Sequence, residues 1–339
     1  MNATLDGSHV VNYDCRCMTE EIQKDEDSGD VFNLLSGTIR KGKKVTDVHL
    51  REFGVPTGIK DTKTRLHCYR LQIDANGKVR YKPLAEFLRD RVVDYAIPRK
   101  RIDEAKKYLE ETNSTALLSK LEREARGLFT SLAKSGEGGE LLLFAFAEAV
   151  FGLSQIICKM SLKTSTEMHY HGADGVYAQG IDGVGLGIYW GESKLYGDSS
   201  AAVRDCLKSL APFLLEPDGS DAARSQDVFL INEFSSFDDP KITEGLKKYF
   251  DLDDNHSLQV KHCGIALIGF DSAAYLEDGK NTDNEKLEAE LKAQLPNWMK
   301  QIKKRIGEEN IASYELIFIC VPMRTVEEFR TYFLNLLES

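Results

Sequence analysis

The chain has no apolar run long enough to span a membrane, and its N-terminus has neither the basic nor the apolar segment of an export signal. Its longest apolar stretch, residues 141–158, is interrupted by Glu148, Ser154 and Gln155. Such a stretch is typical of a buried helix rather than a membrane span. We therefore expect a cytoplasmic protein without a membrane segment.

The chain also lacks the cysteine pattern of a disulfide framework. It has seven cysteines, which are scattered and odd in number, and this pattern fits reduced thiols. Cys15 and Cys17 form the only close pair, and their spacing from His9 and His67 matches no common zinc-ligand pattern. We expect ordinary thiols at these positions.

The chain also has fewer basic than acidic residues. It contains 44 Lys and Arg and 54 Asp and Glu, which gives a net charge of −10. Phosphate contacts dominate the affinity of proteins for nucleic acid, so this balance disfavours a protein that binds DNA unaided. The net charge is still compatible with an enzyme that acts on nucleic acid, if its basic residues are clustered or if a partner carries the DNA. Basic clusters occur at residues 40–44, 99–101 and 300–305, although each is equally typical of a solvated surface.

The apolar content is sufficient for a proper core, since 42% of the 339 residues are hydrophobic. In residues 1–135, strand-like segments precede helices, and we expect an α+β accessory or partner-binding section there. After the glycine-rich segment 135–139, strands alternate with helices, which predicts an α/β core over residues 136–339, with a mixed sheet flanked by helices. We expect helices at residues 84–95, 99–111, 114–133, 140–160, 199–215, 243–250, 285–305 (interrupted near Pro296) and 325–337, and strands at residues 66–73, 227–231, 258–270 and 314–321.

The stretch from residue 169 to residue 198 combines an acidic residue, a hairpin with a Gly-Ile-Asp-Gly turn, and a Glu-x-Lys tripeptide. Alternate residues of a strand share a face, so Glu192 and Lys194 should lie side by side while Ser193 points away. The hairpin should also bring Asp174 towards Glu192.

Two carboxylates held close together repel each other unless a cation lies between them. Mg²⁺ or Mn²⁺ suits this place, because such hard cations prefer oxygen ligands and keep several waters. Asp174 and Glu192 are then the expected ligands, with the Ser193 carbonyl as a candidate third. Lys194 would orient or help deprotonate a metal-bound water, and the reaction would be in-line hydrolysis of a phosphodiester.

Each of these residues also has a simpler interpretation. Glu140, in the first turn of a predicted helix, is either a charge placed favourably near the helix dipole or a catalytic, metal-binding acid. A Glu-x-Lys tripeptide alone can be an ordinary ion pair on a strand, and Asp174 can be part of a turn. His169 and His171 would share a strand face, where we expect surface or core histidines rather than ligands.

Taken in order, these features resemble the PD-(D/E)xK nucleases, which have a restriction-endonuclease-like core. The resemblance rests on Asp174 after a small residue, the hairpin, an apolar run and then Glu192-x-Lys194. Glu140 stands where several of those enzymes carry a helical acid that assists metal binding. The sequence departs from the PD-(D/E)xK motif at Ala173, because the motif has a proline directly before the aspartate.

More narrowly, the helix that begins with Glu140 and the segments HGADGVY and GIYWGESKLYGD are similar to the DUF1837 family, the nuclease subunit HamA of the bacterial Hachiman antiphage defence system. This resemblance implies a DNase in which Asp174, Glu192 and Glu140 bind Mg²⁺ or Mn²⁺ and Lys194 is catalytic. It also implies DNA as substrate and a HamB-like superfamily 2 helicase as the partner that restrains the nuclease. Two alternatives stay open, a non-catalytic DNA- or partner-binding regulatory subunit and an RNase of the same fold.

Overall fold

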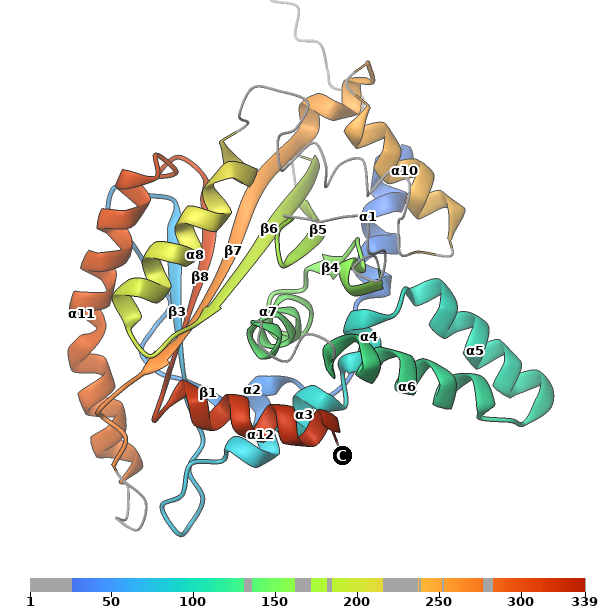
Figure 1. The fold of residues 1–339 in the computed structure, drawn as a ribbon. Coiled ribbons are helices and arrows are strands. Elements are labelled where there is room, and N and C mark those ends of the chain that lie inside the picture. Colours follow the sequence, from blue (N-terminus) through green and yellow to red (C-terminus); the bar gives the residue numbers. More distant parts are fainter. Residues whose placement is uncertain are drawn as a thin grey trace, which may run out of the picture.

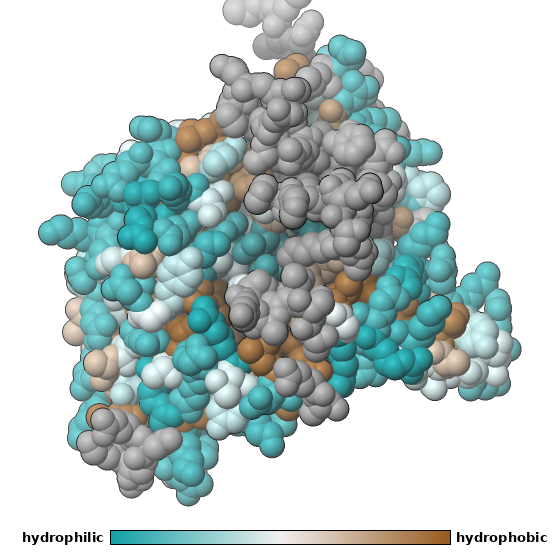
Figure 2. Space-filling view, viewed as in Figure 1, coloured by the Kyte–Doolittle hydropathy of each residue, from teal (hydrophilic) through white to brown (hydrophobic). Residues whose placement is uncertain are grey.

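The computed structural model describes residues 26–130, 136–161, 172–181, 185–215, 237, 239–251, 253–276 and 283–338. One twisted sheet lies at the centre, with helices on both of its faces and at its edges (Figure 1). The surface in the view of Figure 2 is largely hydrophilic, with apolar areas near its centre. This arrangement confirms the expected α/β fold with a mixed, helix-flanked sheet.

The strands of the described residues form one sheet in the order β1-β3-β8-β7-β6-β5-β4, with β2 paired to β3. Their bounds are β1 (Leu50–Glu52), β2 (Thr57–Gly58), β3 (Thr64–Leu71), β4 (Ser154–Gln155), β5 (Gly175–Ile181), β6 (Gly185–Leu195), β7 (Val260–Asp271) and β8 (Glu315–Met323). The central strands β3, β8, β7 and β6 run parallel, whereas β1, β2, β5 and β4 pair antiparallel with their neighbours. The central strands are apolar along most of their length because both faces are covered.

The helices of the described residues are α1 (Glu26–Thr38), α2 (Val45–Val48), α3 (Tyr81–Arg89), α4 (Val92–Ala96), α5 (Arg99–Thr112), α6 (Ala116–Thr130), α7 (Glu137–Ala149), α8 (Ser199–Leu214), α10 (Pro240–Phe250), α11 (Asn284–Glu308) and α12 (Val326–Glu338), with 3-10 turns η1 (Lys159–Ser161) and η2 (Asn255–Gln259). α5 and α6 lie side by side, away from the sheet (Figure 1).

α7 and α8 cover opposite faces of the sheet. Gly264 of β7 lies against Leu210 of α8, and the register pairs Gly264 with Trp190 of β6. The next residue of β6, Gly191, lies instead against Leu143 of α7. Since side chains alternate along a strand, Glu192 and Lys194 belong to the α8 face and Ser193 to the α7 face.

Three predicted helices differ from the structure. The helix expected through residue 160 ends at Ala149, because Gly152 adopts a left-handed φ of 68° and turns the chain into β4. The helix expected at residues 84–95 is broken into α3 and α4. The interruption expected near Pro296 is absent, and α11 continues across it, anchored by buried Trp298 and Ile302.

The N-terminal section shares the sheet with the rest of the chain, because Thr64 to Cys68 of β3 pair with Leu316 to Cys320 of β8. The predicted boundary at residue 135 stays a prediction. A turn at Asn76 and Gly77 follows β3, with Gly77 at a φ of 75° and a bridge between Ile73 and Val79.

Five cysteines in the described part of the chain are buried and free, as expected for reduced thiols. Other predictions fall outside the described residues, namely Cys15, Cys17, His169, His171 and the strand at residues 227–231. Among the helices of the described ranges, none is long and apolar enough to cross a membrane.

Candidate active site

The predicted hairpin is present as β5 and β6, which pair antiparallel from Gly175 opposite Gly191 to Ile181 opposite Gly185. Asp174 directly precedes β5, and its backbone N–H donates to the carbonyl of Gly191 at 2.9 Å. This register places Asp174 beside the position of Glu192 at the open end of the hairpin.

Glu192 and Lys194 lie side by side, as strand alternation predicts. The Nζ of Lys194 donates to Oε1 of Glu192 at 2.5 Å. The Glu192 side chain is 6% exposed and that of Lys194 is 23% exposed. The ion pair is therefore mostly shielded from water, unlike an ordinary surface pair.

Ser193 holds Asp174 in place, although the sequence suggested only its carbonyl as a participant. Its backbone N–H and its Oγ both donate to Oδ2 of Asp174, each at 2.8 Å. Two donors on one oxygen fix the orientation of the carboxylate.

Glu140 lies in the first turn of α7 and is 8% exposed. The hydroxyl of Tyr95 donates to Oε2 of Glu140 at 2.8 Å and lies 3.3 Å from the backbone oxygen of Asp174. A single buried hydroxyl thus connects the helical acid to the acid of the hairpin.

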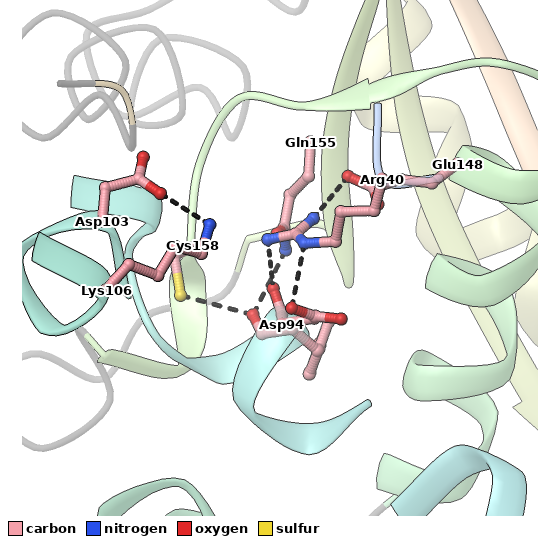
Figure 3. Close-up of polar contacts among 8 residues, drawn as sticks. Arg40, Asp94, Asp103, Lys106, Glu148, Gln155 and Cys158 are labelled. Carbon is pink, nitrogen blue, oxygen red and sulfur yellow. Dashed lines mark hydrogen bonds and ion pairs between the residues drawn. The ribbon is translucent and has the colours of Figure 1, made fainter. Parts of the chain in front are cut away.

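Tyr95 was not predicted as a site residue, because a tyrosine in a short helix carries no local signal of its partner. Burial, followed by the charge of Glu140, raises the pKa of Tyr95 well above its usual value, so the hydroxyl keeps its proton and donates. The backbone oxygen of Tyr95 accepts from Gln155 Nε2 at 3.4 Å and from Cys158 Sγ at 3.3 Å. Figure 3 shows Gln155 and Cys158 on the segment that follows α7.

A second unpredicted residue, Lys159, supports the entrance to β5. Lys159 is 5% exposed, and its Nζ donates a hydrogen bond to the backbone oxygen of Ala173 at 2.7 Å. Since Ala173 directly precedes Asp174, this bond fixes the backbone from which the carboxylate extends.

The electrostatics of the site centre on Glu192. Burial and the nearby charge of Asp174 raise the pKa of Glu192 to about 8, with a smaller contribution from Glu140 and an opposing one from Lys194. Burial alone would lower the pKa of Lys194, but the charges of Glu192 and Asp174 outweigh it and raise that pKa. Lys194 therefore stays charged at neutral pH, while the raised pKa of Glu192 means that added positive charge would favour its ionised form.

The donor set fits a cation held by two carboxylates and water. Mg²⁺ is commonly bound by one or two carboxylates and keeps several waters, and Asp174 and Glu192 provide two. Among the described residues, no group of three or more His, Cys, Asp and Glu is arranged to hold a metal ion. Glu140 projects from α7 on the other face of the sheet from Glu192, so its role as a third ligand stays a prediction.

Fold and sequence pattern together define an α/β protein with a nuclease-like core. The HamA family model matches residues 47–337, which is most of the chain, so the chain belongs to the HamA family, a component of the Hachiman antiphage defence system. This match confirms the resemblance found in the sequence. No curated protein matches the chain.

Proposed function

We propose that this HamA-family chain is a metal-dependent DNase that hydrolyses phosphodiester bonds in antiphage defence. The observation that carries the proposal is the pair Glu192 and Lys194, buried on one strand face beside Asp174, with the pKa of Glu192 raised to about 8. A carboxyl group whose ionised form is disfavoured by another carboxylate is suited to a divalent cation, which stabilises both charges.

Asp174 and Glu192 would hold Mg²⁺ or Mn²⁺. When bound, such a cation neutralises phosphate oxygens and makes a water more acidic. Ser193 fixes one oxygen of Asp174, so that its other oxygen is available for the cation. The ammonium of Lys194 keeps its proton, and it therefore acts as a donor that orients the attacking water or a phosphate oxygen, rather than as a base.

The chain's charge supports a partner that delivers or withholds the substrate. At −10, the chain repels the DNA backbone over long range. A helicase of the HamB type that carries the DNA would supply the missing attraction, and it would also restrain the nuclease until DNA is engaged.

The proposal is tested by incubating supercoiled plasmid with Mg²⁺ and the purified chain, alone and with its helicase partner. Glu192→Gln and Lys194→Met should each lower the cleavage rate by roughly 10²-fold or more, because each removes a charge used in the transition state. Glu315→Gln and Lys261→Met are matched controls, since Lys261 and Glu315 form a 2.5 Å ion pair between β7 and β8. Cleavage by Glu192→Gln at the wild-type rate would reject the proposal.

A further inference from the structure

A cavity of about 340 Å³ lies between the loop from α1 to α2, the junction of α3 with α4, and the last turn of α7. Lys41, Lys43 and Arg91 supply cations to its wall, and Phe87 supplies an aromatic ring. None of these residues belongs to the carboxylate centre described above.

The acidic residues of the same wall are already balanced. Arg40 binds Glu148 at 2.6 Å and Asp94 at 3.2 Å, as Figure 3 shows, and the charge of Arg99 also acts on both acids. Asp90, the other acidic residue of the wall, binds Arg89 at 2.8 Å. The charges of Asp94, Asp90 and Glu148 act on Arg91 from beyond salt-bridge distance. The four cations and three acids of the wall leave an excess of one positive charge.

Arg91 is held rigidly at this wall. Its guanidinium lies 3.9 Å from the centre of the Phe87 ring, and its Nη2 donates to the backbone oxygen of Lys43 at 2.5 Å. A guanidinium that is half-buried and stacked on a ring loses little freedom on binding an anion, and its planar donors match phosphate oxygens.

His49 lies next to the cavity wall, because its ring contacts that of Phe87. Its ring lies 4.7 Å from that of Phe87, and its buried Nδ1 has no hydrogen-bond partner among the described residues. Burial lowers the pKa of His49, and the charges of Arg80, Arg91 and Lys43 lower it further. The positive charges of Arg91 and Lys43 thus extend from the cavity wall to His49.

We propose that Lys43, Arg91 and their cationic neighbours form a phosphate-binding subsite for the sugar–phosphate backbone of a nucleic acid. The subsite rests on the proposed function for its choice of ligand, because α7 connects it to the candidate centre. Glu148 at the cavity and Glu140, which the Tyr95 hydroxyl connects to the backbone of Asp174, are eight residues apart on α7, or about 12 Å along the helix axis. At about 3.4 Å of axis per nucleotide, one strand would span both places with three to four nucleotides.

The local excess of cations also fits the acidic chain. A chain of charge −10 has to gather positive charge locally if it contacts phosphate at all. The sequence cluster at residues 40–44 contributes to this subsite, but its Arg40 is used to anchor the loop to α7 rather than to face a ligand.

The test measures binding of a fluorescein-labelled oligonucleotide by anisotropy, with the full chain carrying Glu192→Gln and with EDTA present to prevent cleavage. Arg91→Gln and Lys43→Gln should each weaken binding roughly 3- to 10-fold and lower the dependence of log Kd on log salt by about one unit of slope. Lys107→Gln is the control of equal charge change, because Lys107 is exposed on α5 and pairs with Glu111. Lys43 is exposed, so its variant reports on binding even if Arg91→Gln lowers stability.

Equal affinities and equal salt slopes for the Lys43, Arg91 and Lys107 variants would overturn the subsite, as would the absence of oligonucleotide binding at low salt. Competition by inorganic phosphate alone, without loss of oligonucleotide affinity in the variants, would also overturn it, because the site would then take free phosphate. The outcomes of this binding test can be distinguished from those of the cleavage test of the nuclease proposal. A weakened Arg91 variant with cleavage unaffected by Glu192→Gln would reject the nuclease and keep the subsite.

Discussion

The charge of Glu192 depends strongly on its surroundings. Its pKa of about 8 in the folded protein compares with a usual value near 4.5. Between those two pH values, the folded chain binds more protons than the unfolded chain. The free energy of unfolding therefore falls as pH rises from about 4.5 to about 8, and the loss is complete above that range.

This titration gives a measurable prediction for the metal-free protein. In EDTA, the free energy of unfolding of the wild type should fall with pH between 5 and 8 more steeply than that of Glu192→Gln, by at most about 1.4 kcal/mol per pH unit. Urea denaturation at several pH values measures both slopes. Identical slopes would show that Glu192 titrates in its usual range, and saturating Mg²⁺ should flatten the wild-type slope.

Tyr95 positions Glu140 and the backbone of Asp174 rather than touching substrate. Tyr95→Phe removes a hydrogen bond to a carboxylate, so it should lower stability by about 1.5–3 kcal/mol and raise the Mg²⁺ concentration needed for half-maximal cleavage. Tyr177→Phe is the matched control. The Tyr177 hydroxyl is buried with no hydrogen-bond partner in the described part of the chain, so its removal should be neutral or stabilising. A change in stability alone, with an unaltered Mg²⁺ requirement, would show that Tyr95 stabilises the fold but does not position the metal ligands.

At the scale of the element, the β5–β6 hairpin is what makes the site. It sets Asp174 against the end of β6, while β6 presents Glu192 and Lys194 together. The hairpin is packed so closely that its glycines cannot be replaced freely. A Cβ atom at Gly175 would lie 2.5 Å from the hydroxyl oxygen of Tyr177 and 2.7 Å from the nearest carbon of its ring.

Gly175→Ala should therefore destabilise the protein by about 1–3 kcal/mol and reduce cleavage, because the strand next to Asp174 has to shift. Gly58→Ala is the control on another strand, since a Cβ atom there has nothing within 4 Å. Thermal unfolding and plasmid cleavage measure the two effects. Equal behaviour of both variants would show that the hairpin tolerates displacement without loss of the site.

At the scale of the whole molecule, local pattern predicted the hairpin, the shared face of Glu192 and Lys194, and most helices. These features depend on alternation and on residues near in sequence. The pairing of Thr64 in β3 with Leu316 in β8 could not be predicted in this way, because contacts between such distant segments depend on how the whole sheet assembles. The bond from Tyr95 to Glu140 is likewise tertiary, since it joins α4 to α7.

The uneven distribution of charge is also a property of the whole molecule. The chain carries a net charge of −10, yet in its described part cations gather at one cavity, and Lys194 pairs with Glu192 at the candidate centre. Such a distribution suits an enzyme that contacts DNA at few points and relies on a partner for the rest of its affinity.

The central claim is a metal-dependent centre on the β5–β6 hairpin. Metal binding tests it most directly, because binding needs neither DNA nor a partner. Titration calorimetry with Mn²⁺ at pH 7, in two buffers of different ionisation enthalpy, should show binding to the wild type with release of protons, since the metal favours the ionised form of Glu192, whose pKa is raised in the metal-free protein. Binding should be lost in Glu192→Gln and retained in Glu315→Gln. Equal binding by all three proteins, without proton release, would contradict the account.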